Sequence, residues 1–174
     1  MQLAITLLGT KTTLYIPEVL SAVSNCKCNV VEFRSSQLAE ASAAYLLIDG
    51  NWNHLAKLEN LLENLQTRLD VRLHTVRPET GKGTNQVIPY SLETVSLYRN
   101  EIILDITSFL LSRNIEIEEI SASRYLAHYC ESPIFSTRFI IAIPSKIHLL
   151  SFREEFLDFC DNLNLDAILE PLKR

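Results

Sequence analysis

The sequence lacks the features that mark several common classes of protein. It has only four cysteines, four glycines and one methionine in 174 residues, and no apolar run approaches the roughly 18 residues needed to cross a bilayer. Its first segment, MQLAITLLGTKTTLY, has no basic residue ahead of the short apolar run, which argues against a secretion signal. We therefore expect a cytoplasmic protein without membrane spans.

Clustered positive charge is also missing. The sixteen Lys and Arg residues are scattered along a chain of net charge -5, whereas binding to a phosphate backbone needs a basic patch. An RNA-binding sheet would also need exposed aromatic residues on its central strands, and Phe33 and Tyr45 alone do not supply them. We expect no direct contact with nucleic acid.

Two of the four cysteines lie one residue apart, in the stretch SNCKCNVVEF at residues 24–33. A zinc site would need two more soft ligands at ordered spacing, but Cys130 and Cys160 lie far along the chain. A free cysteine is commonly a small buried hydrophobe. We predict that Cys26 and Cys28 pack in the core, reduced and without a metal ion.

Two other segments contain residue types found in phosphate-binding or catalytic sites. The stretch TGKGT, residues 80–84, lacks the first glycine of a phosphate loop and is not fed by a strand that leads into a helix. Residues 128–131, HYCE, include a nucleophile and a base, but no third group is evident to orient them. We predict no catalytic residues, no cofactor and no enzymatic activity.

The clearest pattern is a spacing of large apolar residues at intervals of 3, 4, 3 and 4, which places them on one stripe of a helix. It occurs twice, with every position shifted by 94 residues: Leu55, Leu58, Leu62, Leu65 and Leu69, then Leu149, Phe152, Phe156, Phe159 and Leu163. Short polar side chains can accept hydrogen bonds from the first turn of a helix. Asn53 and Ser145 are therefore the predicted helix starts.

Strand-like runs flank both of these helices, and a further strand, helix and strand precede each set. In the first half the successive elements are expected at residues 3–8, 17–26, 29–39, 43–50, 53–69 and 70–76. In the second half they are expected at residues 93–98, 101–113, 115–125, 137–144, 145–163 and 165–172. Each half is βαββαβ, so we predict an α+β protein of two ferredoxin-like units, with helices on one face of each antiparallel sheet.

A segment rich in turn-forming residues separates the two halves. RPETGKGTNQVIP, residues 77–89, holds two of the four glycines and two of the six prolines, a composition typical of a linker. We predict a first domain at residues 1–77, a linker at 78–89 and a second domain at 90–174.

The loop GTKTTLYIP follows the first strand and enters the first helix. A loop in this position presents unpaired backbone amides to a bound carboxylate. Gly9 permits close backbone approach, and Lys11 can pair with an anion. Hydroxyl groups come from Thr10, Thr12 and Thr13. The loop is either a binding site for an amino-acid-sized carboxylate or a plain polar surface loop.

The segments AITLLG, SNCKCNVVEFRSSQLA and DGNWNHLAKLENLL, together with the repeated pattern, resemble tandem ACT domains. Within them the chain resembles the glycine cleavage system transcriptional repressor family, over essentially its whole length. This resemblance implies a non-enzymatic regulator that contacts a DNA-bound transcription factor. It also implies an amino-acid effector, glycine in the best-known case, and leaves a homodimer open.

ACT domains usually bind amino acids where the first loop meets the start of the second strand, often across a domain interface. By this resemblance the family's loop glycine falls on Gly9, and its strand-opening pair falls on Asn29 and Val30. With Thr10 and Lys11 these residues form the predicted effector site. Lys11 stands where the family has Asp, which favours an anionic ligand over a zwitterion.

The second half departs further from the family pattern. Glu116 replaces the strand-opening asparagine, and the loop YRNEI has no glycine, so we expect its equivalent site to be weaker or empty. Two alternative functions remain: an interaction module without effector binding, and a regulatory subunit of an amino-acid metabolic enzyme.

Overall fold

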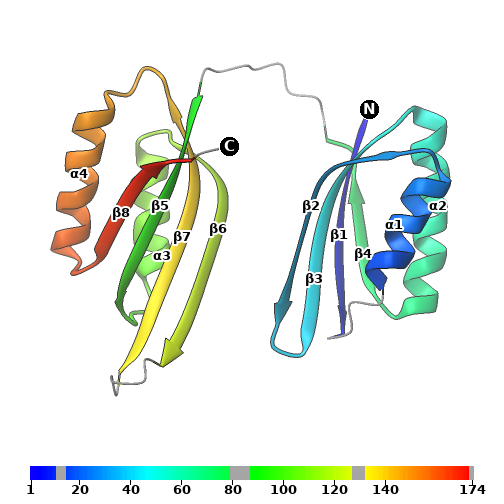
Figure 1. The fold of residues 1–174 in the computed structure, drawn as a ribbon, viewed down its shortest axis with the longest axis horizontal. Coiled ribbons are helices and arrows are strands. Elements are labelled where there is room, and N and C mark those ends of the chain that lie inside the picture. Colours follow the sequence, from blue (N-terminus) through cyan, green and yellow to red (C-terminus); the bar gives the residue numbers. More distant parts are fainter. Residues whose placement is uncertain (11–14, 79–86, 127–131, 173–174) are drawn as a thin grey trace. The chain divides into compact units, whose positions relative to one another are not determined.

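The computed structural model describes residues 1–10, 15–78, 87–126 and 132–172. Within these residues the chain forms two compact units, Met1–Lys82 and Gly83–Arg174, and each unit has the element order βαββαβ. In each unit the two helices lie on the same side of a four-stranded sheet (Figure 1). The predicted α+β architecture of two ferredoxin-like units is confirmed. No helix in the described part of the chain is long and apolar enough to cross a membrane.

Unit 1 is an antiparallel sheet with strand order β2-β3-β1-β4. Its elements are β1 (Gln2–Thr10), α1 (Tyr15–Asn25), β2 (Asn29–Leu38), β3 (Ala41–Asp49), α2 (Trp52–Leu69) and β4 (Arg72–Val76). The helix α1 carries the chain across β3 to the far edge, so β2 lies parallel to β1 with β3 inserted between them. This is the split βαβ arrangement that the repeat predicts.

Unit 2 repeats this topology with strand order β6-β7-β5-β8. Its elements are β5 (Val87–Leu97), α3 (Ile102–Ser112), β6 (Glu116–Leu126), β7 (Pro133–Pro144), α4 (Leu149–Asn162) and β8 (Asp166–Pro171). The strand β5 begins at Val87, so it overlaps the end of the segment 78–89 that the sequence predicts as a linker. Residues 79–86 of that segment lie outside the described residues.

Each unit has its own apolar core, formed between the sheet and the predicted helix stripes. In α2 the buried residues are Leu55, Leu58, Leu62 and Leu65. In α4, Phe152 and Phe156 are buried, and the remaining members of the stripe pack against the same core. The strands contribute alternate residues, because successive side chains of a strand point to opposite faces. Both stripes therefore face the core as predicted.

The cysteines of unit 1 belong to this core. Cys26 and Cys28 are both buried, and the Cys28 thiol donates to the Cys26 carbonyl with a sulfur–oxygen distance of 3.6 Å. A Cβ atom at Gly50 would lie 3.0 Å from the Cys28 sulfur, so the glycine leaves room for that thiol. Burial raises the pKa of Cys28, with smaller contributions from Cys26 and Asp49. The predicted core placement of the pair is confirmed.

The predicted helix starts at Asn53 and Ser145 are wrong. The N-cap of α2 is Asn51, whose side chain accepts from the His54 backbone N–H at 2.8 Å, and Asn53 is already inside the helix. The N-cap of α4 is His148, whereas Ser145 lies in the preceding turn. A cap needs extended backbone dihedrals in addition to a polar side chain, and residue type alone does not reveal the dihedrals.

Truncation of the buried stripes is expected to destabilise the protein. Leu62→Ala and Phe156→Ala each remove a fully buried side chain, and each should lower the free energy of unfolding of its own unit by about 2–5 kcal/mol. Urea denaturation measures the change, with Leu150→Ala as the control because Leu150 is 66% exposed. A loss below about 0.5 kcal/mol, the usual effect of a surface substitution, would show that the stripes do not face the cores.

The thiol of Cys160 is expected to be unreactive in the folded protein. Burial, with a smaller effect of Asp161, raises its pKa to about 12, so about one molecule in ten thousand carries the reactive thiolate at pH 8. In a Cys130→Ser background, a thiol reagent should label Cys160 rapidly only after urea is added, as followed by mass spectrometry. Rapid labelling of the folded protein at this position would contradict the buried placement.

Candidate functional site

The structure separates the two parts of the predicted effector site within unit 1. Gly9 pairs with Ser42 of β3, near the end of β1. Asn29 pairs with Asp49, which also pairs with Gln2 at the start of β1. From Gln2 to Gly9 the strand advances seven residues, or about 23 Å at the rise of an extended chain. One unit alone therefore does not bring Gly9 and Asn29 together.

The described members of the site are accessible at their own ends of the sheet. Thr10 is the last residue of β1 and is exposed, and Asn29 and Val30 are exposed at the start of β2. Val30 is 44% exposed although its counterpart at a shift of 87, Ile117, is only partly exposed. Lys11 lies outside the described residues, as do Thr12 and Thr13.

Gly9 has a packing role that the sequence does not reveal. A Cβ atom at this position would lie 2.9 Å from Cγ1 of Val71 and 3.1 Å from Cε1 of Tyr15. Tyr15 opens α1, is buried, and shares a 2.7 Å hydrogen bond with the hydroxyl of Ser42. The space left by the missing side chain of Gly9 is therefore taken by side chains of the same unit. A substitution at Gly9 would disturb the core as well as any bound ligand.

The equivalent loop of unit 2 is occupied by aromatic side chains. At the shift of 87 residues that relates β1 to β5, Gly9 corresponds to Ser96 and Lys11 to Tyr98. The Tyr98 ring packs edge-on against Phe135 with ring centres 5.4 Å apart, and the guanidinium of Arg124 lies 4.9 Å from the centre of the Tyr98 ring. The weaker or empty second site remains a prediction.

A polar cluster lies on the face of the unit 2 sheet that points away from the helices. Nε of Arg138 lies 3.3 Å from Oε1 of Glu93 and donates to Oγ of Ser91 at 3.3 Å. The cluster borders a hollow of about 330 Å³. Both charged side chains are about half exposed, so their ion pair contributes little to stability.

The described residues contain no cluster with the composition of a metal centre. Across residues 1–10, 15–78, 87–126 and 132–172, no three His, Cys, Asp or Glu side chains lie close enough together to hold a metal ion. The histidine and cysteine at residues 128 and 130, which the sequence analysis considered as a base and a nucleophile, lie outside these ranges.

Comparison with known proteins supports the fold of both units. Residues 1–76 match the family model of the ACT domain. The chain is similar over 99% of its length to 98% of a candidate glycine cleavage system transcriptional repressor, with 21% identity and a TM-score of 0.74. The chain also matches a protein of unknown role from Galdieria sulphuraria, with 16% identity and a TM-score of 0.80. That match covers 99% of this chain and 98% of the other. No curated protein matches the sequence.

Proposed function

We propose, from the premise that residues 1–76 form an ACT domain, that the chain is a cytoplasmic, non-enzymatic regulatory protein. It acts through contact with a DNA-bound transcription factor, and a small amino or carboxylic acid alters that contact. The supporting observation is that the likeness to the candidate glycine cleavage system transcriptional repressor runs through both units rather than through the first alone.

The pairing of arginines with carboxylates supports action through a protein partner rather than through direct DNA binding. Six arginines of the described chain lie within 4 Å of a carboxylate: Arg34, Arg68, Arg77, Arg99, Arg113 and Arg138. Each of these arginines pairs with a carboxylate of its own unit. The six guanidinium groups therefore do not form a patch of unpaired positive charge on one face. Phosphate-backbone binding depends on such a gathered set, and the net charge of -5 adds to the argument.

The separation of Gly9 from Asn29 suggests how an effector would alter the contact. A ligand that touches the loop residues Gly9, Thr10 and Lys11 together with Asn29 and Val30 needs unit 1 from each of two chains, because all five residues belong to unit 1. Such a ligand binds the associated state and not the separate one, so it shifts the association by mass action. A homodimer is the simplest assembly of this kind, because most soluble oligomers are symmetric copies of one chain.

An ACT-type interaction module without an effector is the second candidate. The observation in its favour is the aromatic packing of Tyr98, Phe135 and Arg124 at the loop of unit 2. Unit 2 keeps the same fold although its own side chains pack at the position of the predicted binding loop.

The partner is tested by capture from the cytosol of the native organism, with the tagged protein as bait. We expect a DNA-binding transcription factor to copurify and its amount to change when glycine or a dicarboxylic acid is added. The recovered complex is then rebuilt from purified proteins and measured by gel filtration. Reproducible recovery of a metabolic enzyme in place of a transcription factor would instead support the regulatory-subunit alternative.

The effector site is tested by calorimetry with glycine and succinate on the full chain. If Lys11 pairs with an anion, Lys11→Asp should weaken succinate binding at least tenfold, about 1.4 kcal/mol, because it turns an attraction into a repulsion. Asn29→Ala should weaken it as well. The charge-matched control is Lys57→Asp, on the exposed side of α2, and Glu116→Ala controls for the second unit. Binding that survives both Lys11→Asp and Asn29→Ala would place the site elsewhere.

A further inference from the structure

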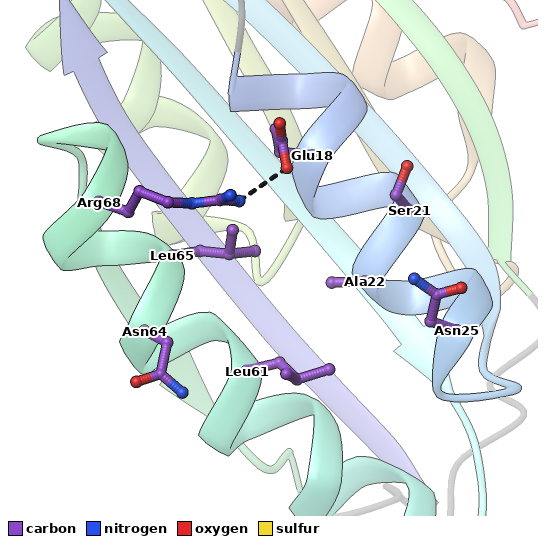
Figure 2. A pocket seen from close by; sticks show the side chains of 8 residues that line it. All are labelled: Glu18, Ser21, Ala22, Asn25, Leu61, Asn64, Leu65 and Arg68. Carbon is purple, nitrogen blue, oxygen red and sulfur yellow. Dashed lines mark hydrogen bonds and ion pairs between the residues drawn. The ribbon is translucent and has the colours of Figure 1, made fainter.

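A groove runs between α1 and α2 on the helix side of unit 1, apart from the ends of the sheet (Figure 2). Its volume is about 320 Å³. Each helix lines it with one stripe at spacings of 0, 3, 4 and 7 residues, from Glu18 to Asn25 on α1 and from Leu61 to Arg68 on α2. Residues at these spacings share one face of a helix, so the two stripes form the two walls.

The groove has an apolar floor and a charged end. Ala22, Leu61 and Leu65 form the floor, and all three belong to the core of unit 1 or pack against it. At one end Nη2 of Arg68 donates to Oε2 of Glu18 at 2.8 Å (Figure 2). The two side chains are 61% and 47% exposed, so both charges are accessible to a ligand in the groove.

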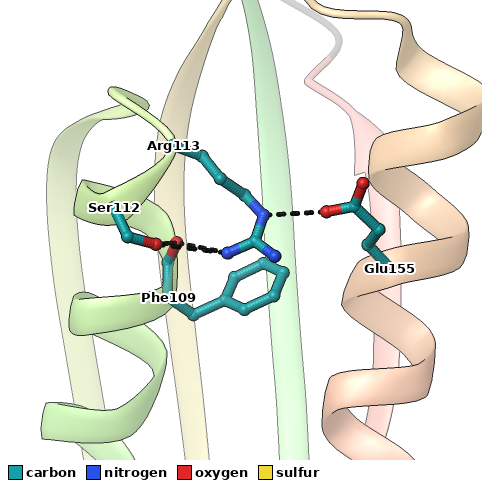
Figure 3. Close-up of polar contacts among 4 residues, drawn as sticks. All are labelled: Phe109, Ser112, Arg113 and Glu155. Carbon is teal, nitrogen blue, oxygen red and sulfur yellow. Dashed lines mark hydrogen bonds and ion pairs between the residues drawn. The ribbon is translucent and has the colours of Figure 1, made fainter.

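Unit 2 carries larger side chains at two positions that match the groove floor. At shifts of 87 and 94 residues, Ala22 corresponds to Phe109 and Leu65 to Phe159. The two phenyl rings stack with their centres 4.4 Å apart. The guanidinium of Arg113 lies 3.7 Å from the centre of the Phe109 ring and forms a 3.0 Å ion pair with Glu155 (Figure 3). At these matched positions unit 2 therefore has two stacked rings where unit 1 has the floor residues Ala22 and Leu65.

The charged end is also specific to unit 1. The counterpart of Glu18 is Asp105, which pairs with Arg99 ahead of α3 at 2.7 Å. The counterpart of Arg68 is Asn162, whose amide donates to a carbonyl of its own helix, that of Asp158, at 2.8 Å. The pair of opposite charges that joins the two helices of unit 1 therefore has no equivalent at the matched positions of unit 2.

We propose that the groove between α1 and α2 binds one free α-amino acid with an apolar side chain. Its carboxylate binds Arg68, its ammonium group binds Glu18, and its side chain lies on the floor formed by Ala22, Leu61 and Leu65. An exposed ion pair contributes little to stability. A zwitterion therefore replaces it at small cost and gains two charge-assisted hydrogen bonds.

Size and charge select this ligand class. A volume of about 320 Å³ is at the lower end of the roughly 300–1,000 Å³ of small-molecule pockets. The eight residues from Glu18 to Asn25 span about 10 Å of helix, which is enough for one amino acid and too short for an extended peptide. A ligand with a single sign of charge would be repelled by one member of the pair. This site goes beyond the proposed function, and its preference differs from the anion preference expected at Lys11.

The test is calorimetry on the full chain with leucine and phenylalanine, alongside their N-acetyl and amide derivatives, which lack the ammonium group and the carboxylate. We expect one ligand per chain and at least tenfold weaker binding of both derivatives. Glu18→Gln and Arg68→Gln should each weaken binding at least tenfold. Ala22→Phe, which copies unit 2, should abolish it. Lys11→Asp should leave it unchanged, which separates this site from the proposed effector site.

The control is Arg113→Gln, which removes the ion pair with Glu155 in unit 2 and should leave the affinity unchanged. Each variant is checked by circular dichroism and urea denaturation. Glu18 and Arg68 are exposed, so their variants decide the question even if Ala22→Phe does not fold. The proposal is wrong if no apolar amino acid binds saturably, or if binding persists in the Glu18→Gln/Arg68→Gln double variant. It is also wrong if the groove variants change only the oligomeric state in light scattering, because the groove is then an interface between copies.

Discussion

Burial of one sheet face beneath two helices is the constraint on which the rest of each unit depends. Four strands leave an apolar face that must be covered, and in each unit the two helices pack their apolar stripes against it. The same constraint operates twice with different side chains. In unit 1 the bulk near the loop comes from Tyr15 of α1 above the small Ser42, joined by a 2.7 Å hydrogen bond. At the equivalent positions of unit 2 the bulk comes from the strand, as Phe135, and the helix contributes Ile102.

The order of the strands has a direct consequence for ligand binding. Because β1 and β2 are parallel, the end of one and the start of the other lie at opposite ends of the sheet. A site assembled from Gly9 and Asn29 therefore requires unit 1 from two chains. In the proposed function this topology would couple effector binding to association, which is the property that a regulator acting through protein contacts requires.

The sequence predicted the fold well because the fold rests on periodicity. The intervals of the two helix stripes and the shift between them are visible without coordinates, and the buried residues of α2 and α4 agree with them. The helix caps were not predictable in this way. Asn51 and Asn53 are the same residue type two positions apart, and only the extended backbone of Asn51 makes it the cap. The packing of Gly9 and Tyr15 against Val71 joins two distant parts of the sequence, and no periodicity reports such a contact.

The groove differs from these cases, since its signal was present in the sequence. Aligning the halves at a shift of 87 places Ala22 opposite Phe109, and a small residue opposite a large one in a repeated core position indicates either a compensating change or an open space. Leu65 is smaller than its counterpart Phe159 as well, so the helix pair of unit 1 does not compensate with bulk. A second difference appears at the end of β1, where unit 1 has Gly9 while unit 2 packs Tyr98 against Phe135. The groove of unit 1 thus lacks the two stacked phenyl rings that occupy the matched helix positions of unit 2. This difference between the two units is the reason that both proposed ligand sites are placed in unit 1 rather than in unit 2.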